Sequence, residues 1–164
     1  MEPKDIHERL KETFGAKIAS SVLEAIDPYL VVETAAIAEV CRYLKEEPDL
    51  AFDTLMCLSG VDTKEKLQVV YHLYSIARRH RVVLKVETPR EGEPSVPTVS
   101  HLWGTADFHE REAYDMFGFR FEGHPDLRRI LCPDDWEGYP LRKDYVYPET
   151  YRDIDNRQVE TRDA

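Results

Sequence analysis

Cysteine is scarce in this chain of 164 residues, and no cysteine lies in a recognisable motif. The three cysteines, Cys41, Cys57 and Cys132, are separated by long and unequal gaps, and none belongs to a Cys-x-x-Cys pair. Disulfide frameworks use an even number of cysteines, and iron–sulfur clusters use closely spaced thiolates. The sequence therefore argues against a disulfide scaffold and against an iron–sulfur cluster on this chain.

Long apolar runs are also missing. No stretch approaches the ~20 apolar residues that a transmembrane helix needs, and Met1-Glu2-Pro3-Lys4 leads into polar sequence without a signal core. A presequence rich in Arg and Ser is absent as well, which argues against a mitochondrial precursor. We expect a soluble chain that stays in the compartment where it is made.

Positive charge is in deficit, with 22 Lys and Arg against 32 Asp and Glu and a formal net charge of -10. Nucleic-acid binding requires a surplus of basic residues on at least one face, so this class of partner is not expected. Local basic clusters remain and are either solvated loops or partner contacts: Arg78-Arg79-His80-Arg81, Arg128-Arg129 and Arg142-Lys143. Glycine-rich nucleotide cradles and a Gly-x-Ser-x-Gly nucleophile elbow are absent.

The amino-terminal third predicts two helices around a short hairpin. Apolar residues recur at helical spacing over residues 4–14, and Gly15 follows as a C-cap. Residues 20–34 form two short apolar runs around an Asp-Pro turn, which favours a β-hairpin, although Ile18, Val22 and Ile26 also fit helical spacing. Thr34 is expected to be the N-cap of a second helix that ends near residue 47.

The middle of the chain changes to strand patterns. Three segments, residues 52–60, 66–76 and 81–88, are joined by short polar linkers and predict an antiparallel meander. The proline-rich stretch 89–98 predicts a loop, and residues 102–117 predict a helix. The fold class is therefore α+β, a single domain with an antiparallel or mixed sheet packed on helices.

The carboxy-terminal segment, residues 124–164, has no helical or strand periodicity. It contains several prolines together with Tyr, Trp and Arg, whereas disordered chains are poor in aromatic residues. So long a segment without secondary structure is unusual in a lone compact domain. We therefore divide the chain into an α+β domain, residues 1–123, and an extended segment, 124–164, that wraps a partner.

The stretch "HEREAYDMFGF", residues 109–119, contains the residues most suggestive of chemistry. A zinc-protease helix needs His-Glu-x-x-His, but Ala113 occupies the position of the second histidine. A metal site assembled by folding, using His101 and His109, stays open, as does a hydrolase that uses His109, Glu110 and Glu112. Glu110 borders the apolar stripe of the helix and is either a perturbed carboxylate or a buried one paired with an arginine or backbone donors.

The opposite face of this helix carries Phe108, Arg111, Glu112 and Asp115. Arg111 and Asp115 stand at i and i+4, so a salt bridge between them is predicted. An aromatic ring among charges, on the side away from the core stripe, indicates a second packed surface. An incidentally exposed phenylalanine is the other interpretation.

A family resemblance rests on the residues of this helix and of the segment after it. "EREAYDMF" (110–117), then His124, then Arg128-Arg129-Ile130-Leu131 resembles the signature of the C subunit of respiratory complex I, the proton-pumping NADH:quinone oxidoreductase. "VVYHLYSIARRHRVVLKV", "VPTVSHLW" and "DDWEGYPLRKDY" are also similar to that family, so the resemblance covers about residues 50–147.

The resemblance implies a cofactor-free subunit of the hydrophilic arm, peripheral on the cytoplasmic face of the bacterial inner membrane. It would bind the large hydrogenase-like subunit (the D subunit) beside the quinone cavity and perform no chemical step, since NADH, FMN, iron–sulfur clusters and quinone bind to other subunits. Some relatives are fused to the large subunit, and this chain is expected to be the stand-alone form. We assign partner contacts to Phe108, Glu110, Arg111, Glu112, Asp115, His124, Arg128, Arg129, Trp136, Arg142, Lys143 and Tyr145. The alternative is the equivalent subunit of a related membrane-bound [NiFe]-hydrogenase or of a quinone dehydrogenase with another electron donor.

Overall fold

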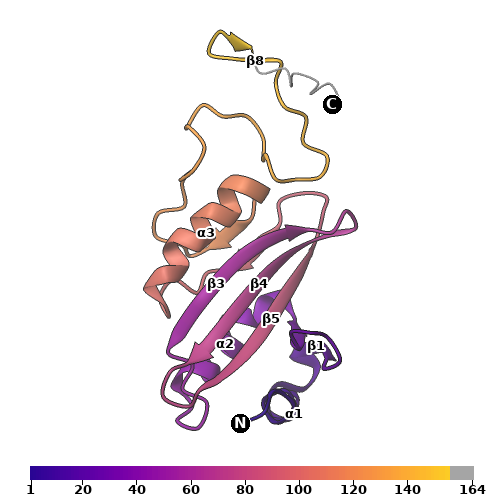
Figure 1. Cartoon of the computed structure of the whole chain (residues 1–164), viewed down its shortest axis with the longest axis vertical. Helices are drawn as coiled ribbons and strands as arrows, with labels where there is room; N and C mark the ends of the chain where they lie inside the picture. The colour runs from indigo at the N-terminus through magenta and orange to yellow at the C-terminus, as the bar shows by residue number, and fades with distance from the viewer. Residues whose placement is uncertain (156–164) are drawn as a thin grey trace, which may run out of the picture.

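A five-stranded mixed sheet organises the computed structural model, which describes residues 1–155 (Figure 1). The strands are β1 (Ile18–Val22), β2 (Tyr29–Val32), β3 (Thr54–Asp62), β4 (Lys66–Ser75) and β5 (His80–Pro89), in the spatial order β1-β2-β5-β4-β3. Antiparallel pairing of β3, β4 and β5 confirms the predicted meander, and the β1–β2 hairpin is confirmed as well. The hairpin joins the meander by parallel pairing of β2 with β5, which makes the sheet mixed.

Two helices from the amino-terminal third contribute to the core on one face of the sheet. Helix α1 (Pro3–Phe14) ends at Gly15, whose φ of 51° fits the predicted C-cap. A 3₁₀ turn, η2 (Thr34–Ala36), leads into α2 (Ile37–Glu46). The predicted N-cap at Thr34 is therefore wrong, because its hydroxyl donates to the carbonyl of Glu87 in β5 instead.

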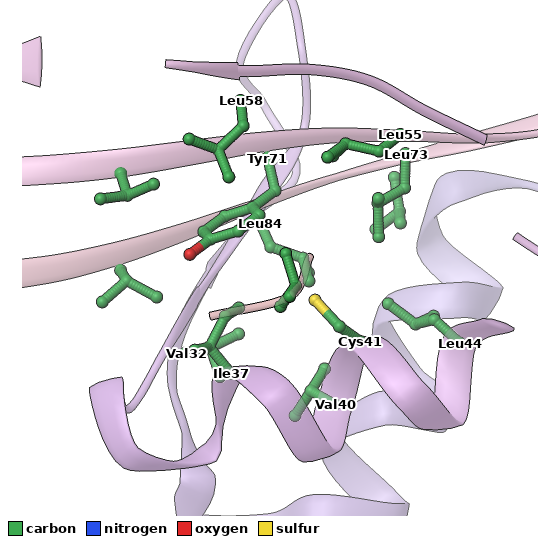
Figure 2. Packing of buried hydrophobic residues seen from close by; sticks show 14 of the residues in the cluster. Val32, Ile37, Val40, Cys41, Leu44, Leu55, Leu58, Tyr71, Leu73 and Leu84 are labelled. Carbon is green, nitrogen blue, oxygen red and sulfur yellow. The ribbon is translucent and has the colours of Figure 1, made fainter. Parts of the chain in front are cut away.

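The core lies between α2 and the sheet (Figure 2). Alternation along β4 directs Leu67, Val69, Tyr71 and Leu73 into this layer, where each is almost completely buried. Residues of α2 at helical spacing meet them from the other side, among them Cys41 and Leu44. At roughly 25 cal/mol per Å² of apolar surface, burying each such side chain contributes about 1.5–3 kcal/mol.

A third helix, α3 (Gly104–Phe117), lies along strand β3. The Leu58 N–H donates to His109 Nδ1 at 3.3 Å, and the Thr105 hydroxyl donates to the Leu55 carbonyl at 3.3 Å. Side chains of α3 thus satisfy backbone groups at the edge of β3 that no neighbouring strand reaches. Gly60 allows the close approach, because a methyl group there would overlap the Phe117 ring.

Short strands flank α3. Strand β6 (Ser95–Pro97) pairs in parallel with β7 (Arg120–Glu122), so the predicted loop over 89–98 is wrong for its last third. Beyond Gly123 the chain is extended and projects past α3, away from the amino terminus (Figure 1). It contains a small hairpin of β8 (Thr150–Tyr151) and β9 (Ile154–Asp155). The last nine residues of the predicted partner-wrapping segment, 156–164, lie outside the described residues.

The fold confirms the predicted α+β class with a mixed sheet on helices. No helix within residues 1–155 combines the length and the apolar character needed to cross a bilayer. Whether the chain divides into two units at Gly123 stays a prediction, because it concerns how the parts fold when separated.

Candidate functional site

Asp115 of α3 is the most heavily hydrogen-bonded side chain of the predicted site. Its carboxylate is completely buried. One oxygen accepts the backbone N–H groups of Ile130, Leu131 and Cys132, at 3.0, 2.7 and 2.8 Å. The other oxygen accepts the guanidinium of Arg129 at 2.6 Å. Burial alone would raise the pKa of Asp115, but these donors outweigh burial and lower its pKa, so the carboxylate is ionised.

Two arginines extend the contacts of this carboxylate. Arg129 also donates to the carbonyls of Trp136 and Gly138, at 2.8 and 3.0 Å. Arg111 donates to the carbonyls of Arg128 and Arg129, at 3.3 and 3.2 Å, and is itself buried. The predicted Arg111–Asp115 salt bridge is therefore wrong, because both side chains bind the segment after residue 127 instead of each other.

Asp115 is the first anchor of the segment after residue 127, and Asp62 is a second anchor that holds this segment about fifteen residues further on. The Asp62 carboxylate, at the end of β3, accepts the Lys143 backbone N–H and the Arg90 guanidinium, both at 2.8 Å. Arg90 also binds Asp144 at 2.7 Å. Burial opposes ionisation of Asp62, but the two backbone donors, from Lys143 and Lys64, and Arg90 lower its pKa. We call residues 128–144, which lie between the Asp115 and Asp62 contacts, the strap.

The carboxy-terminal end of α3 supplies a third set of contacts to the strap. The Met116 carbonyl accepts the Leu141 N–H at 3.1 Å, and the Phe117 carbonyl accepts Arg142 Nε at 2.6 Å. The last carbonyls of a helix have no partner within the helix, so the strap satisfies groups that otherwise need water. Gly118 follows with φ of 80°, and a Cβ there would lie 2.5 Å from the Tyr139 ring.

Glu110 occupies a separate, completely buried position on α3. It accepts the Val99 N–H at 2.7 Å and the Thr98 hydroxyl at 2.5 Å. Its pKa is raised to about 7, mainly by burial and also by the nearby Asp107 carboxylate, and the two hydrogen bonds oppose this rise. The buried carboxylate with a backbone donor is thus one of the two interpretations of the sequence, and the raised pKa agrees with the other; its side-chain partner is a threonine and not an arginine.

The side chain of His124 is buried beside Glu110 and Asp107. The Asp126 N–H donates to His124 Nδ1 at 3.0 Å, so the neutral ring carries its proton on Nε2. That nitrogen is 3.1 Å from the Asp107 carbonyl, to which it donates, and 3.9 Å from the Glu110 carboxylate. The Nε2–H group is therefore directed at the Asp107 carbonyl and lies further from the Glu110 carboxylate.

The remaining predicted residues differ in how far they reach solvent. Phe108 is 59% exposed with the Arg111 guanidinium 5.9 Å from its ring, and Glu112 is exposed beside it. Arg128 pairs with Asp126, while the side chain of Lys143 extends into solvent. Trp136 packs on Tyr151 with ring centroids 5.0 Å apart, and the Tyr145 hydroxyl donates to the Glu137 carbonyl.

An apolar surface along the strap and the residues just after it was not predicted from the sequence. Leu131 is 63% exposed, Leu141 52% and Val146 85%, and Ile130 and Tyr147 are also exposed. The backbone N–H groups of Ile130, Leu131 and Leu141 are bound by Asp115 or α3, while their side chains are exposed. Neither Asp62 nor Arg90 carries a local sequence signal for its role, since each binds residues more than 50 positions away.

Acid–base chemistry on a substrate is not supported by this geometry. Glu110 is enclosed by protein, and His109 Nδ1 is occupied by the Leu58 N–H. Within the described part of the chain, no three His, Cys, Asp or Glu side chains are grouped so that they could hold a metal ion. The exposed groups of the site are apolar surfaces and charges at their margins, which is the composition of a protein interface.

Residues 30–151 match the protein family described as "Respiratory-chain NADH dehydrogenase, 30 Kd subunit". The C subunit of NADH-quinone oxidoreductase from Chlorobium phaeobacteroides is 48% identical over 149 residues, which cover 88% of this chain and 89% of the relative. The corresponding protein of Chloroherpeton thalassium is 46% identical, over 93% of this chain and 65% of the relative. A chain in the solved structure of the membrane-bound sulfane sulfur reductase, an archaeal respiratory membrane complex, is similar with a TM-score of 0.70 and 25% identity, over 87% of this chain and 85% of that one.

Proposed function

Because the chain belongs to the 30 kDa subunit family of respiratory-chain NADH dehydrogenase, we propose that it is a structural and assembly subunit of NADH:quinone oxidoreductase. In this role it docks on the large hydrogenase-like subunit, the D subunit, in the hydrophilic arm beside the quinone cavity. It binds no cofactor and performs no chemical step, and it reaches the cytoplasmic face of the bacterial inner membrane through its partners.

The observation that carries the proposal is the exposed apolar surface on a fastened strap. Leucine and valine side chains that are more than half exposed lie close together in sequence at Leu131, Leu141 and Val146. Several exposed apolar side chains on one segment of a folded protein indicate a binding site, because covering them removes unfavourable contact with water. The basic and aromatic residues around it, among them Arg128, Trp136 and Lys143, are suited to the rim of such an interface.

Co-purification tests the proposal directly. A tagged chain expressed in native membranes should retain the large subunit, and Leu131→Glu or Val146→Glu should abolish that retention by placing a charge in the interface. Ile26→Glu is the matched control, since Ile26 is 99% exposed in the turn between β1 and β2 and is not part of the strap. Equal retention by all four proteins, or no large subunit with the unaltered chain, would refute the docking role.

A second candidate is favoured by the structural similarity to the sulfane sulfur reductase complex. The chain would then be the equivalent subunit of a related membrane-bound complex, such as a [NiFe]-hydrogenase or a dehydrogenase with another electron donor. The purified complex distinguishes the two, because NADH-binding subunits and NADH oxidation are expected only under the first proposal. Genes for NADH-binding subunits next to the gene for this chain would independently support the first proposal.

A further inference from the structure

The strap has no helix or strand, and a chain of this kind commonly becomes ordered only when it meets a partner. The contacts in this structure indicate a different behaviour. We propose that the strap already holds its docking conformation in the free chain, and that Asp115 and Asp62 are the positioning residues that fix it. The identity of the partner, the large subunit, rests on the proposed function. The conformation of the strap in the free chain does not depend on that proposal.

The first argument is the geometry at Asp115. One carboxylate oxygen collects three consecutive N–H groups, from Ile130, Leu131 and Cys132, so the backbone there is curved around the anion. Such a concave arrangement of N–H groups is a recognised anion-binding shape, and here the anion belongs to the same chain. Because Asp115 is completely buried, water does not compete for these hydrogen bonds.

Arg129 restrains the part of the strap that follows residue 132. Its guanidinium joins the Asp115 carboxylate to the carbonyls of Trp136 and Gly138, which stand seven and nine residues later. The bend between residues 129 and 138 is thus closed by side-chain bonds, each assisted by charge. The Tyr139 ring then lies against Gly118, with the guanidiniums of Arg129 and Arg142 at 5.7 and 4.8 Å from its centre.

The second anchor fixes the far end independently. Asp62 binds the Lys143 N–H from strand β3, and Arg90, just after strand β5, binds both Asp62 and Asp144. The strap is therefore attached to α3 at one end and to the edge of the sheet at the other. A segment restrained at both ends and in its middle loses much of the freedom that binding would otherwise have to remove.

The consequence concerns the apolar surface that the partner meets. Leu131 donates its own backbone N–H to Asp115, and Leu141 donates its backbone N–H to the Met116 carbonyl of α3. The backbone that carries these exposed side chains is therefore fixed before any partner arrives. The occupant that suits them is an apolar groove on the large subunit, and association requires little reorganisation of this chain.

Hydrogen exchange of the free full-length chain tests the inference. The amides of Ile130, Leu131, Cys132 and Lys143 should exchange at least about tenfold more slowly than in an unstructured peptide. Asp115→Asn should remove that protection from residues 130–132, and Asp62→Asn should remove it from Lys143. Asp126→Asn, an exposed aspartate paired with Arg128, is the control and should change neither. Unchanged slow exchange at Tyr71 in the core shows that each variant remains folded.

Binding of the purified large subunit supplies the second measurement. If the preformed strap contributes to docking, Asp115→Asn should raise the dissociation constant about tenfold, which corresponds to roughly 1.4 kcal/mol. Random-coil exchange across residues 128–144 in the unaltered chain would overturn the inference, as would an unchanged dissociation constant for a variant that has lost protection. Protected amides in a chain that does not bind the large subunit would refute the proposed function and leave the preformed strap supported.

Discussion

Replacing Glu110 by Gln should make the protein more stable at pH 8 and leave it nearly unchanged at pH 5. The Glu110 carboxyl has its pKa raised from an ordinary value of 4.5 to about 7, first because it is buried. In the unfolded chain this group ionises near pH 4.5, whereas in the folded protein it stays protonated up to about pH 7. The unfolded state therefore binds fewer protons across that window, so stability decreases as the pH rises through it.

The size of the effect follows from the shift. Each pKa unit corresponds to 1.36 kcal/mol, so a shift of this size amounts to about 3 kcal/mol between pH 4.5 and 7. Well below pH 4.5, Glu110 is protonated in both the folded and the unfolded chain, and its ionisation then takes nothing from the stability of the protein. Glutamine resembles the protonated acid: its oxygen can accept the Val99 N–H, and its amide can donate to Thr98, whose hydroxyl can turn to Ser100 Oγ at 2.9 Å.

Urea denaturation at several pH values between 5 and 8 measures this difference. The unaltered protein should lose about 3 kcal/mol relative to Glu110→Gln over that range, or roughly 1 to 3 M urea in the transition midpoint. Burial lowers the pKa of His7, so this group makes the protein more stable as the pH rises. The effect is the same in the unaltered protein and in Glu110→Gln, and it cancels in the difference between them. Glu112→Gln, two residues away and exposed, should retain the pH dependence of the unaltered protein. Parallel curves for the unaltered protein and Glu110→Gln would refute the burial argument.

Three further substitutions test other parts of the structure. Phe108→Glu should change the free energy of unfolding by no more than about 0.5 kcal/mol, because the ring is exposed, yet reduce recovery of the large subunit in co-purification. Tyr71→Phe should change stability by less than about 1 kcal/mol in thermal denaturation, since the buried Tyr71 hydroxyl has no hydrogen-bond partner among residues 1–155; a large loss would reveal a partner such as internal water. Gly118→Ala should cost at least about 2 kcal/mol in the same assay, because a positive φ disfavours alanine and its Cβ would overlap Tyr139; an unchanged melting temperature would show that the strap moves aside readily.

The sequence was sufficient for features that depend on local periodicity. Alternation in β4 and helical spacing in α1, α2 and α3 correctly indicated the meander and the helices, since each pattern reflects which face of one element is buried. The apolar stripe of α3 likewise placed Glu110 at the margin of the core. The family was identified from the residues around α3, and the match over residues 30–151 confirms it.

Features that depend on distant parts of the chain were not predicted. Helix geometry alone favours an Arg111–Asp115 salt bridge, but three backbone N–H groups and Arg129 form a better site for that carboxylate. Parallel pairing of β6 with β7 and the role of Asp62 require residues that only the tertiary fold brings together. The partner contacts assigned from the sequence stay predictions, and the structure adds that Arg111, Asp115 and Arg129 bind the strap of their own chain.

Parallel pairing of β2 with β5 has a consequence for how the chain is made. Tyr29 pairs with Val83, 54 residues later, so the ribosome must synthesise all of that intervening sequence before the hairpin has a strand to join. At roughly 5–20 residues per second, the delay is about 3 to 11 s. During that time Leu30 and Val32, which are buried in the finished protein, have no sheet to cover them. The nascent amino-terminal third is therefore the stretch in which we expect chaperones to engage this protein.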